Sequence, residues 1–136
     1  MRINILGRPT KKVKKKQLEL AGRWFCKKLF DPATLRRLKV EVKLNISDPY
    51  YFGEAFYSNP KDCNYRYNIS LNRHLGDARM IATLAHELVH VKQYVYGEYV
   101  KFTRPDKEHL VKWCGEYIDH QTTSYWEYPW EIEACG

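Results

Sequence analysis

Apolar and polar residues alternate most regularly over residues 38–46. Apolar side chains occupy every second position there, and polar ones lie between them, which predicts a half-buried strand. Shorter runs of the same kind predict strands over Arg2–Leu6, Gly53–Tyr57 and Tyr65–Leu71. Beyond Gly97, residues 98–102 are expected to be extended, and residues 112–118 to form a hairpin that turns near Gly115.

A different spacing, of three to four residues, predicts helices. Leu18, Ala21, Phe25 and Leu29 share one face of a helix expected to run from an N-cap at Thr10 to about Phe30, with Trp24 broadening that face. Asp31-Pro32 should end this helix and start a short turn of another. Pro129 suits the first turn of a short helix near the end of the chain.

The longest predicted helix covers residues 77–96, which contain neither proline nor glycine. Its apolar stripe is Met80, Leu84, Leu88, Val91 and Val95. These elements together predict an α+β fold, with an N-terminal helix, a small mixed or antiparallel sheet of about three to four strands, the 77–96 helix and a short C-terminal helix. A chain of 136 residues is expected to form one domain, residues 1–136.

The 77–96 helix carries the sequence His86-Glu87-Leu88-Val89-His90. Residues four apart lie on one side of a helix, so His86 and His90 can bind one metal ion. Glu87 lies about 100° further round, where it suits a general base that acts on water at the metal. A catalytic zinc ion takes three protein ligands, and the candidates for the third are Glu131, Glu133, His109, His120 and Glu127.

Glu131 and Glu133 are the strongest candidates, because the helix after Pro129 has apolar neighbours that can anchor it. With this Glu-x-Glu-Ala segment, the His-Glu-x-x-His motif resembles the gluzincin metallopeptidases, and in detail the small SprT-like or minigluzincin proteins of phage and bacteria. That resemblance implies a catalytic core over residues 38–136 and a third ligand three residues before Ala134, which is Glu131. Glu133 remains the alternative. An aspartate often follows the alanine in those families and orients a ligating histidine, but Cys135 stands there.

The resemblance also concerns the strand that begins at Gly53. In thermolysin the corresponding strand pairs with the backbone of the substrate, which implies contacts at Ala55 and Phe56 here. His120, Tyr117, Tyr125 and Tyr128 are candidates for the group that stabilises the carbonyl oxygen in the transition state. The expected function is therefore that of a zinc-dependent endopeptidase. A zinc-stabilised binding module and a latent protease covered by its N-terminal segment are the alternatives.

Charge is distributed unevenly. Residues 1–43 hold 14 Lys/Arg and 3 Asp/Glu, whereas residues 44–136 hold 9 and 13. This basic N-terminal segment contains Lys11, Lys12, Lys14, Lys15 and Lys16, which can bind nucleic acid weakly or form the solvated face of a helix. The sequence lacks a signal-peptide pattern, a transmembrane stretch and a C-x-x-C pair, so we expect a cytoplasmic protein with reduced cysteines and no membrane contact.

Overall fold

The computed structural model describes residues 1–102 and 104–135, so residues 103 and 136 of the predicted domain lie outside the described part. The fold is α+β, as predicted. Along the chain the elements are β1 (Arg2–Leu6), α1 (Lys15–Leu29), α2 (Pro32–Arg37), β2 (Lys39–Ile46), β3 (Gly53–Ala55), α3 (Pro60–Cys63), β4 (Arg66–Asn72), α4 (Asp77–Val95), β5 (Tyr99–Lys101), η1 (Pro105–Lys107), β6 (Leu110–Trp113), β7 (Glu116–Asp119), η2 (Tyr125–Glu127) and α5 (Pro129–Cys135).

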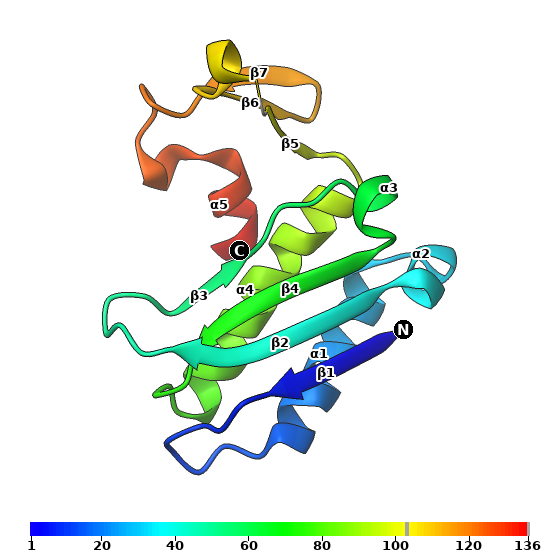
Figure 1. Cartoon of the computed structure of the whole chain (residues 1–136), viewed down its shortest axis with the longest axis vertical. Helices are drawn as coiled ribbons and strands as arrows, with labels where there is room; N and C mark the ends of the chain where they lie inside the picture. Colours follow the sequence, from blue (N-terminus) through cyan, green and yellow to red (C-terminus); the bar gives the residue numbers. More distant parts are fainter. Residues whose placement is uncertain (103, 136) are drawn as a thin grey trace.

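The main sheet has four strands in the order β1-β2-β4-β3 (Figure 1). β1, β2 and β4 are parallel, and β3 is antiparallel to β4 at the edge. The sheet is therefore mixed, in agreement with the prediction. A parallel pair needs a long crossover connection, and α1 with α2 supplies the one between β1 and β2.

Helices α1 and α4 cover one face of this sheet, and the core lies between them and the strands (Figure 1). The alternating residues of β2 explain this arrangement, because Val40, Val42 and Leu44 are buried while Lys43 and Asn45 are exposed. Leu84, Leu88 and the rest of the predicted stripe on α4 are buried, except for Val95, which is partly buried. The other side of the sheet, which we call the open face, is not covered by these two helices.

Helix α1 begins later than the sequence predicts. Thr10 is not its N-cap, because its hydroxyl lies 2.9 Å from His74 Nδ1 and 3.2 Å from the Arg73 carbonyl oxygen, far along the chain. Trp24 does not broaden the buried face either, since it is 57% exposed. Gly22 lies in the core instead, where a Cβ would come within 2.6 Å of Ile3 Cδ1. The missing side chain allows α1 to pack closely on β1.

Of the predicted strands, one is shorter than expected and one is shifted by one residue, to Arg66–Asn72. The strand from Gly53 ends at Ala55, and residues 60–63 form a short helix that the sequence analysis did not predict. Tyr65 precedes β4 with a positive φ of 60°, so it does not continue the alternation of that strand. Asn64, the C-cap residue of α3, has the same left-handed conformation, and this ends the helix.

The C-terminal region forms a second, antiparallel sheet in the order β5-β6-β7, with its turn at Cys114 and Gly115. Aromatic rings connect it to the main body. Tyr99 lies 5.4 Å from Tyr94 on α4 and 5.2 Å from Trp130 on α5, measured between ring centroids. These ring contacts help to hold α5, which lies against α4 (Figure 1). Among the described residues, no helix has the length and apolar character to cross a membrane.

Candidate metal centre

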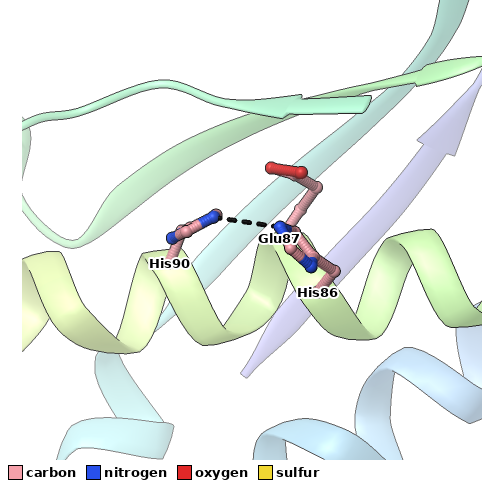
Figure 2. Close-up of side chains that lie close together, drawn as sticks. All are labelled: His86, Glu87 and His90. Atoms are coloured by element: carbon pink, nitrogen blue, oxygen red, sulfur yellow. Dashed lines mark hydrogen bonds between the residues drawn. The ribbon is translucent and has the colours of Figure 1, made fainter. Parts of the chain in front are cut away.

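The predicted metal ligands on α4 lie together. Helical spacing places the side chains of His86, Glu87 and His90 on one side of the helix (Figure 2), with one potential ligand atom of each within 4.8 Å of the others. His86 Nε2 and His90 Nε2 are 3.2 Å apart. His90 and Glu87 are buried, whereas His86 is partly exposed. The group can hold a metal ion.

Helix α5 brings Glu131 to the same point. Its carboxylate oxygens lie 3.1 Å from His86 Nε2 and 3.2 Å from His90 Nε2. Ligand atoms of a tetrahedral zinc ion, each about 2.0–2.2 Å from the metal, are about 3.3 Å from one another. The separation of the two imidazole nitrogens, 3.2 Å, is close to one edge of such a tetrahedron, and the Glu131 carboxylate faces them with one oxygen near each ring. Glu87 also lies near both rings, and the carboxylate of Glu131 is in direct contact with both of them.

Of the candidate third ligands, the structure brings only Glu131 to both imidazoles within the described part of the chain. Glu133, two residues further along α5, lies on another side of the helix, with Oε1 3.2 Å from Lys92 Nζ. His120 Nε2 lies 2.6 Å from the Glu108 carbonyl oxygen. The backbone N–H of His120 donates to the His109 carbonyl oxygen, so these two histidines lie together. Glu127 is exposed on η2.

Gln93, which the sequence analysis did not select, fixes the orientation of His90. Its side chain is fully buried. Gln93 Nε2 donates to the Trp130 carbonyl oxygen at 2.9 Å and to Glu133 Oε1 at 3.0 Å. Both partners are acceptors, so the Gln93 carbonyl oxygen must be the atom that faces His90 Nδ1, 2.9 Å away.

This orientation determines the tautomer of His90. Because Gln93 Oε1 can only accept, Nδ1 carries the proton, and in the neutral ring the lone pair is on Nε2. That nitrogen points at His86 and Glu131, as a metal ligand must. The sequence signal that could have identified Gln93 is its position, a polar residue three places after His90 beside the apolar stripe of the helix. Its partner on α5 could not be read from the sequence.

Glu133 contacts both Gln93 and Lys92, and so helps to fix the position of the Gln93 side chain. Its carboxylate bonds to Gln93, and it shares Lys92 with Glu98, whose carboxylate oxygen lies 2.8 Å from Lys92 Nζ. Partial burial alone would lower the pKa of Lys92, but the two glutamates raise it overall. Lys92 therefore stays charged and ties α4 to both α5 and the segment before β5.

Charge interactions at the centre follow from burial and contact. Burial by itself would raise the pKa of Glu131, but the hydrogen bonds with His86 and His90 outweigh it and hold the pKa below its usual range. Burial likewise would lower the pKa of His90, yet Glu131 and Gln93 raise it overall. The carboxylate of Glu131 is thus ionised at neutral pH and ready to bind a cation.

Glu87 lies beside the contact that Glu131 makes with His86 and His90. It is 6% exposed, and burial, the largest effect, raises the pKa of its carboxyl against the lowering effect of the two histidines. β3 passes close above it, which requires Gly53. A Cβ at that position would lie 3.3 Å from Glu87 Cγ and 2.7 Å from Thr83 Cγ2.

The centre opens into a cleft of about 800 Å³ between β3, α4 and α5. Phe52 and Phe56 hydrogen-bond to β4, so the backbone groups of Gly53 and Ala55 point away from the sheet, toward this side. Tyr94 and Tyr125 also line the cleft. Apart from a long hydrogen bond of 3.4 Å from Tyr94 Oη to the Ala55 carbonyl oxygen, the described contacts leave this edge accessible.

The predicted substrate contacts separate into two groups. Ala55 and Tyr125 line the cleft, and Tyr125 Oη donates to Glu131 Oε2 at 3.0 Å. His120, Tyr117, Tyr128 and Phe56 are not among the described residues that line it. Tyr128 donates to the His120 carbonyl oxygen, and Tyr117 stacks on Phe102 beside the second sheet.

Cys135 occupies the position where the resemblance implied an aspartate. Its Sγ lies 3.9 Å from His86 Nδ1. A thiol is a much weaker hydrogen-bond partner than a carboxylate. His86 is therefore oriented less firmly than His90, which has Gln93.

Comparisons of this chain with protein-family models, with curated proteins and with solved structures give no significant match.

Proposed function

We propose that this protein is a zinc-dependent endopeptidase of the gluzincin type. The observation that carries the proposal is the contact of the Glu131 carboxylate with both His86 Nε2 and His90 Nε2, at 3.1 and 3.2 Å, with the buried Glu87 beside them. Two imidazoles and one carboxylate are a common ligand set of catalytic zinc in peptidases, because they leave the fourth position for water.

His86, His90 and Glu131 would hold the ion. When bound, zinc would supply a Lewis acid that lowers the pKa of water and polarises a peptide carbonyl. Glu87 accepts the proton of the attacking water and delivers it to the nitrogen of the leaving amine. Its burial keeps competing water away, and a nearby cation would lower the pKa of its carboxyl and favour the basic form.

The substrate class that fits the cleft is an extended polypeptide. The outward backbone groups of Gly53 and Ala55 can pair with the main chain of a peptide, as a further strand would. Tyr125, whose hydroxyl lies on the Glu131 side of the cleft, is the candidate donor to the carbonyl oxygen. The mechanism needs a polypeptide that can adopt an extended form over several residues.

The test compares the wild type with Glu87→Gln, after each has been loaded with zinc. Glutamine keeps the shape of the side chain but cannot accept a proton, so we expect the same zinc content and a rate at least about 10²-fold lower. Unfolded protein and a peptide library are the substrates. Glu127→Gln is the control, because this carboxylate is exposed and outside the cleft.

Equal cleavage by wild type and Glu87→Gln would show that Glu87 is not the base. If the wild type holds one zinc ion but cleaves nothing, the zinc-stabilised binding module or the latent protease replaces the proposal. Wild type that binds no zinc, with His86→Ala/His90→Ala as the reference, refutes the metal centre itself.

A further inference from the structure

Three cations lie side by side in one row across the open face of the main sheet. The strand register pairs Arg2 of β1 with Lys39 of β2, and Lys39 with Arg66 of β4. Residues paired in this way project from the same face. Adjacent strands are about 4.8 Å apart, so the three side chains start within about 10 Å.

This row belongs to the face that α1 and α4 leave uncovered. Arg2 and Arg66 are exposed, and Lys39 is partly exposed. None of the three is in an ion pair with a described residue. The nearest acid on the same face, Glu41, is in the next row and lies 3.7 Å from Lys43.

Like charges directly opposite each other on adjacent strands destabilise a sheet. No ion pair with a described residue offsets this repulsion, and the Glu41 carboxylate in the next row is paired with Lys43, so the row is unfavourable for folding alone. An anionic partner would reverse the sign of the interaction. Arg36 and Arg37, both exposed at the end of α2, extend the positive charge from the start of β2.

An aromatic ring lies at the same end of the sheet. Tyr65 comes directly before Arg66, and its carbonyl oxygen accepts a hydrogen bond from the backbone N–H of Lys39. Its φ of 60° is a left-handed conformation that bulky residues rarely adopt. The partly exposed ring lies 5.5 Å from the Arg37 guanidinium carbon. A ring and a guanidinium plane are the two surfaces on which unstacked bases stack.

We propose that the open face, at the row Arg2–Lys39–Arg66, binds single-stranded nucleic acid. Its phosphates would contact the three cations in turn as the strand crosses the sheet, and a base would stack at Tyr65 and Arg37. An acidic peptide fits this face less well, because the backbone groups of β2 and β4 are paired with strands on both sides, so that only the outer edge of β1 could recognise a main chain. The proposal does not depend on the zinc centre or on peptidase activity.

The site differs from the lysine run of the same basic segment. Lys11, Lys12 and Lys14 lie before α1, and all are exposed. Removal of three charges from that run is therefore a matched control for the removal of three charges from the row. The two variants have the same net charge and the same number of glutamines.

The experiment measures fluorescence anisotropy of a labelled single-stranded oligonucleotide over a series of salt concentrations. Arg2→Gln/Lys39→Gln/Arg66→Gln should lower the slope of log affinity against log salt by about two, since each single-strand phosphate contact contributes about 0.7. At about 0.1 M salt this is a loss of about 100-fold. The control, Lys11→Gln/Lys12→Gln/Lys14→Gln, should lose less than about tenfold.

Thermal unfolding of each variant checks the fold. The row variant should unfold at the wild-type temperature or above it, because the repulsion has been removed. If it unfolds earlier, the three single glutamine variants replace it, and each should lower the slope by about 0.7. Tyr65→Leu should weaken binding at least fivefold with the slope unchanged.

Four results would overturn the proposal. The wild type could fail to bind the oligonucleotide, or the row variant could bind it as well as the wild type does. The row variant and its control could lose the same affinity, or the wild type could bind a polyglutamate peptide more tightly than the oligonucleotide. Equal affinity for a duplex of the same length, or unchanged binding by Tyr65→Leu, would overturn the assignment to single strands.

Discussion

Replacement of Gln93 by methionine tests how His90 is held. Methionine has nearly the same length and flexibility, so the core around α4 can stay filled. The change removes the oxygen that accepts from His90 Nδ1, 2.9 Å away. It also removes the two hydrogen bonds that Gln93 donates to α5, which are 2.9 and 3.0 Å long. Gln93 is fully buried, so water cannot replace these bonds.

Two effects of different size should follow. Three lost hydrogen bonds, one of them to a charged carboxylate, should lower the free energy of unfolding of the zinc-free protein by about 2–4 kcal/mol. Separately, the imidazole of His90 loses the partner that fixes its tautomer. Loss of such a supporting partner typically weakens metal binding by about 10–100-fold, or about 1.4–2.8 kcal/mol.

The measurements are urea unfolding of the zinc-free protein and zinc titration against a competing chelator. NMR of the histidine ring nitrogens adds a direct view, since the wild type should show a proton on Nδ1 of His90. Glu133→Ala is the matched control, because it removes one of the bonds of Gln93 but leaves the contact with His90 in place. Its zinc affinity should fall by less than that of the methionine variant.

A zinc affinity within twofold of wild type for Gln93→Met would refute the reasoning, whatever the change in stability. In the zinc-loaded wild type, a proton on Nε2 of His90 would refute it as well, because a protonated nitrogen cannot present a lone pair to the metal. Equal losses in Gln93→Met and Glu133→Ala would mean that the position of α5, and not the tautomer, limits metal binding.

Three further predictions concern other parts of the structure. Glu131→Ala should weaken zinc binding by more than about 100-fold, the upper limit for a supporting residue, and Glu133→Ala by less; the reverse order in a chelator competition would exchange their roles. Gly53→Ala should cost about 1–3 kcal/mol in urea unfolding, because its Cβ would overlap α4. Gly76→Ala has open space around it, but this residue is the N-cap of α4, so the change should cost less than about 1 kcal/mol. Hydrogen bonds to the carboxylate of Asp31 lower its pKa from 3.8 to about 2. Ionised Asp31 therefore stabilises the fold above about pH 4, and this contribution is lost as the pH falls toward 2. The difference in melting temperature between wild type and Asp31→Asn should shrink over that range, and a constant difference would contradict the prediction.

The sequence by itself determined the local features. Period-two alternation identified β2, and a three-to-four spacing identified α4, because burial of one face acts on neighbours along a single element. The spacing of His86 and His90 needs only one helix, so their proximity followed without any knowledge of the fold. The ends of elements were less accurate, as Thr10 shows, because its hydroxyl finds a partner near residue 74 and not at the start of α1.

Only the tertiary structure decided which distant residues meet. Glu131 reaches the imidazoles because the aromatic cluster of Tyr94, Tyr99 and Trp130 helps to hold α5 on α4, and a contact across 45 positions leaves no periodic signal. The same holds for the row of Arg2, Lys39 and Arg66. Their alignment depends on strand order and register, which are set by how the whole sheet packs against its helices and by no property of the separate strands.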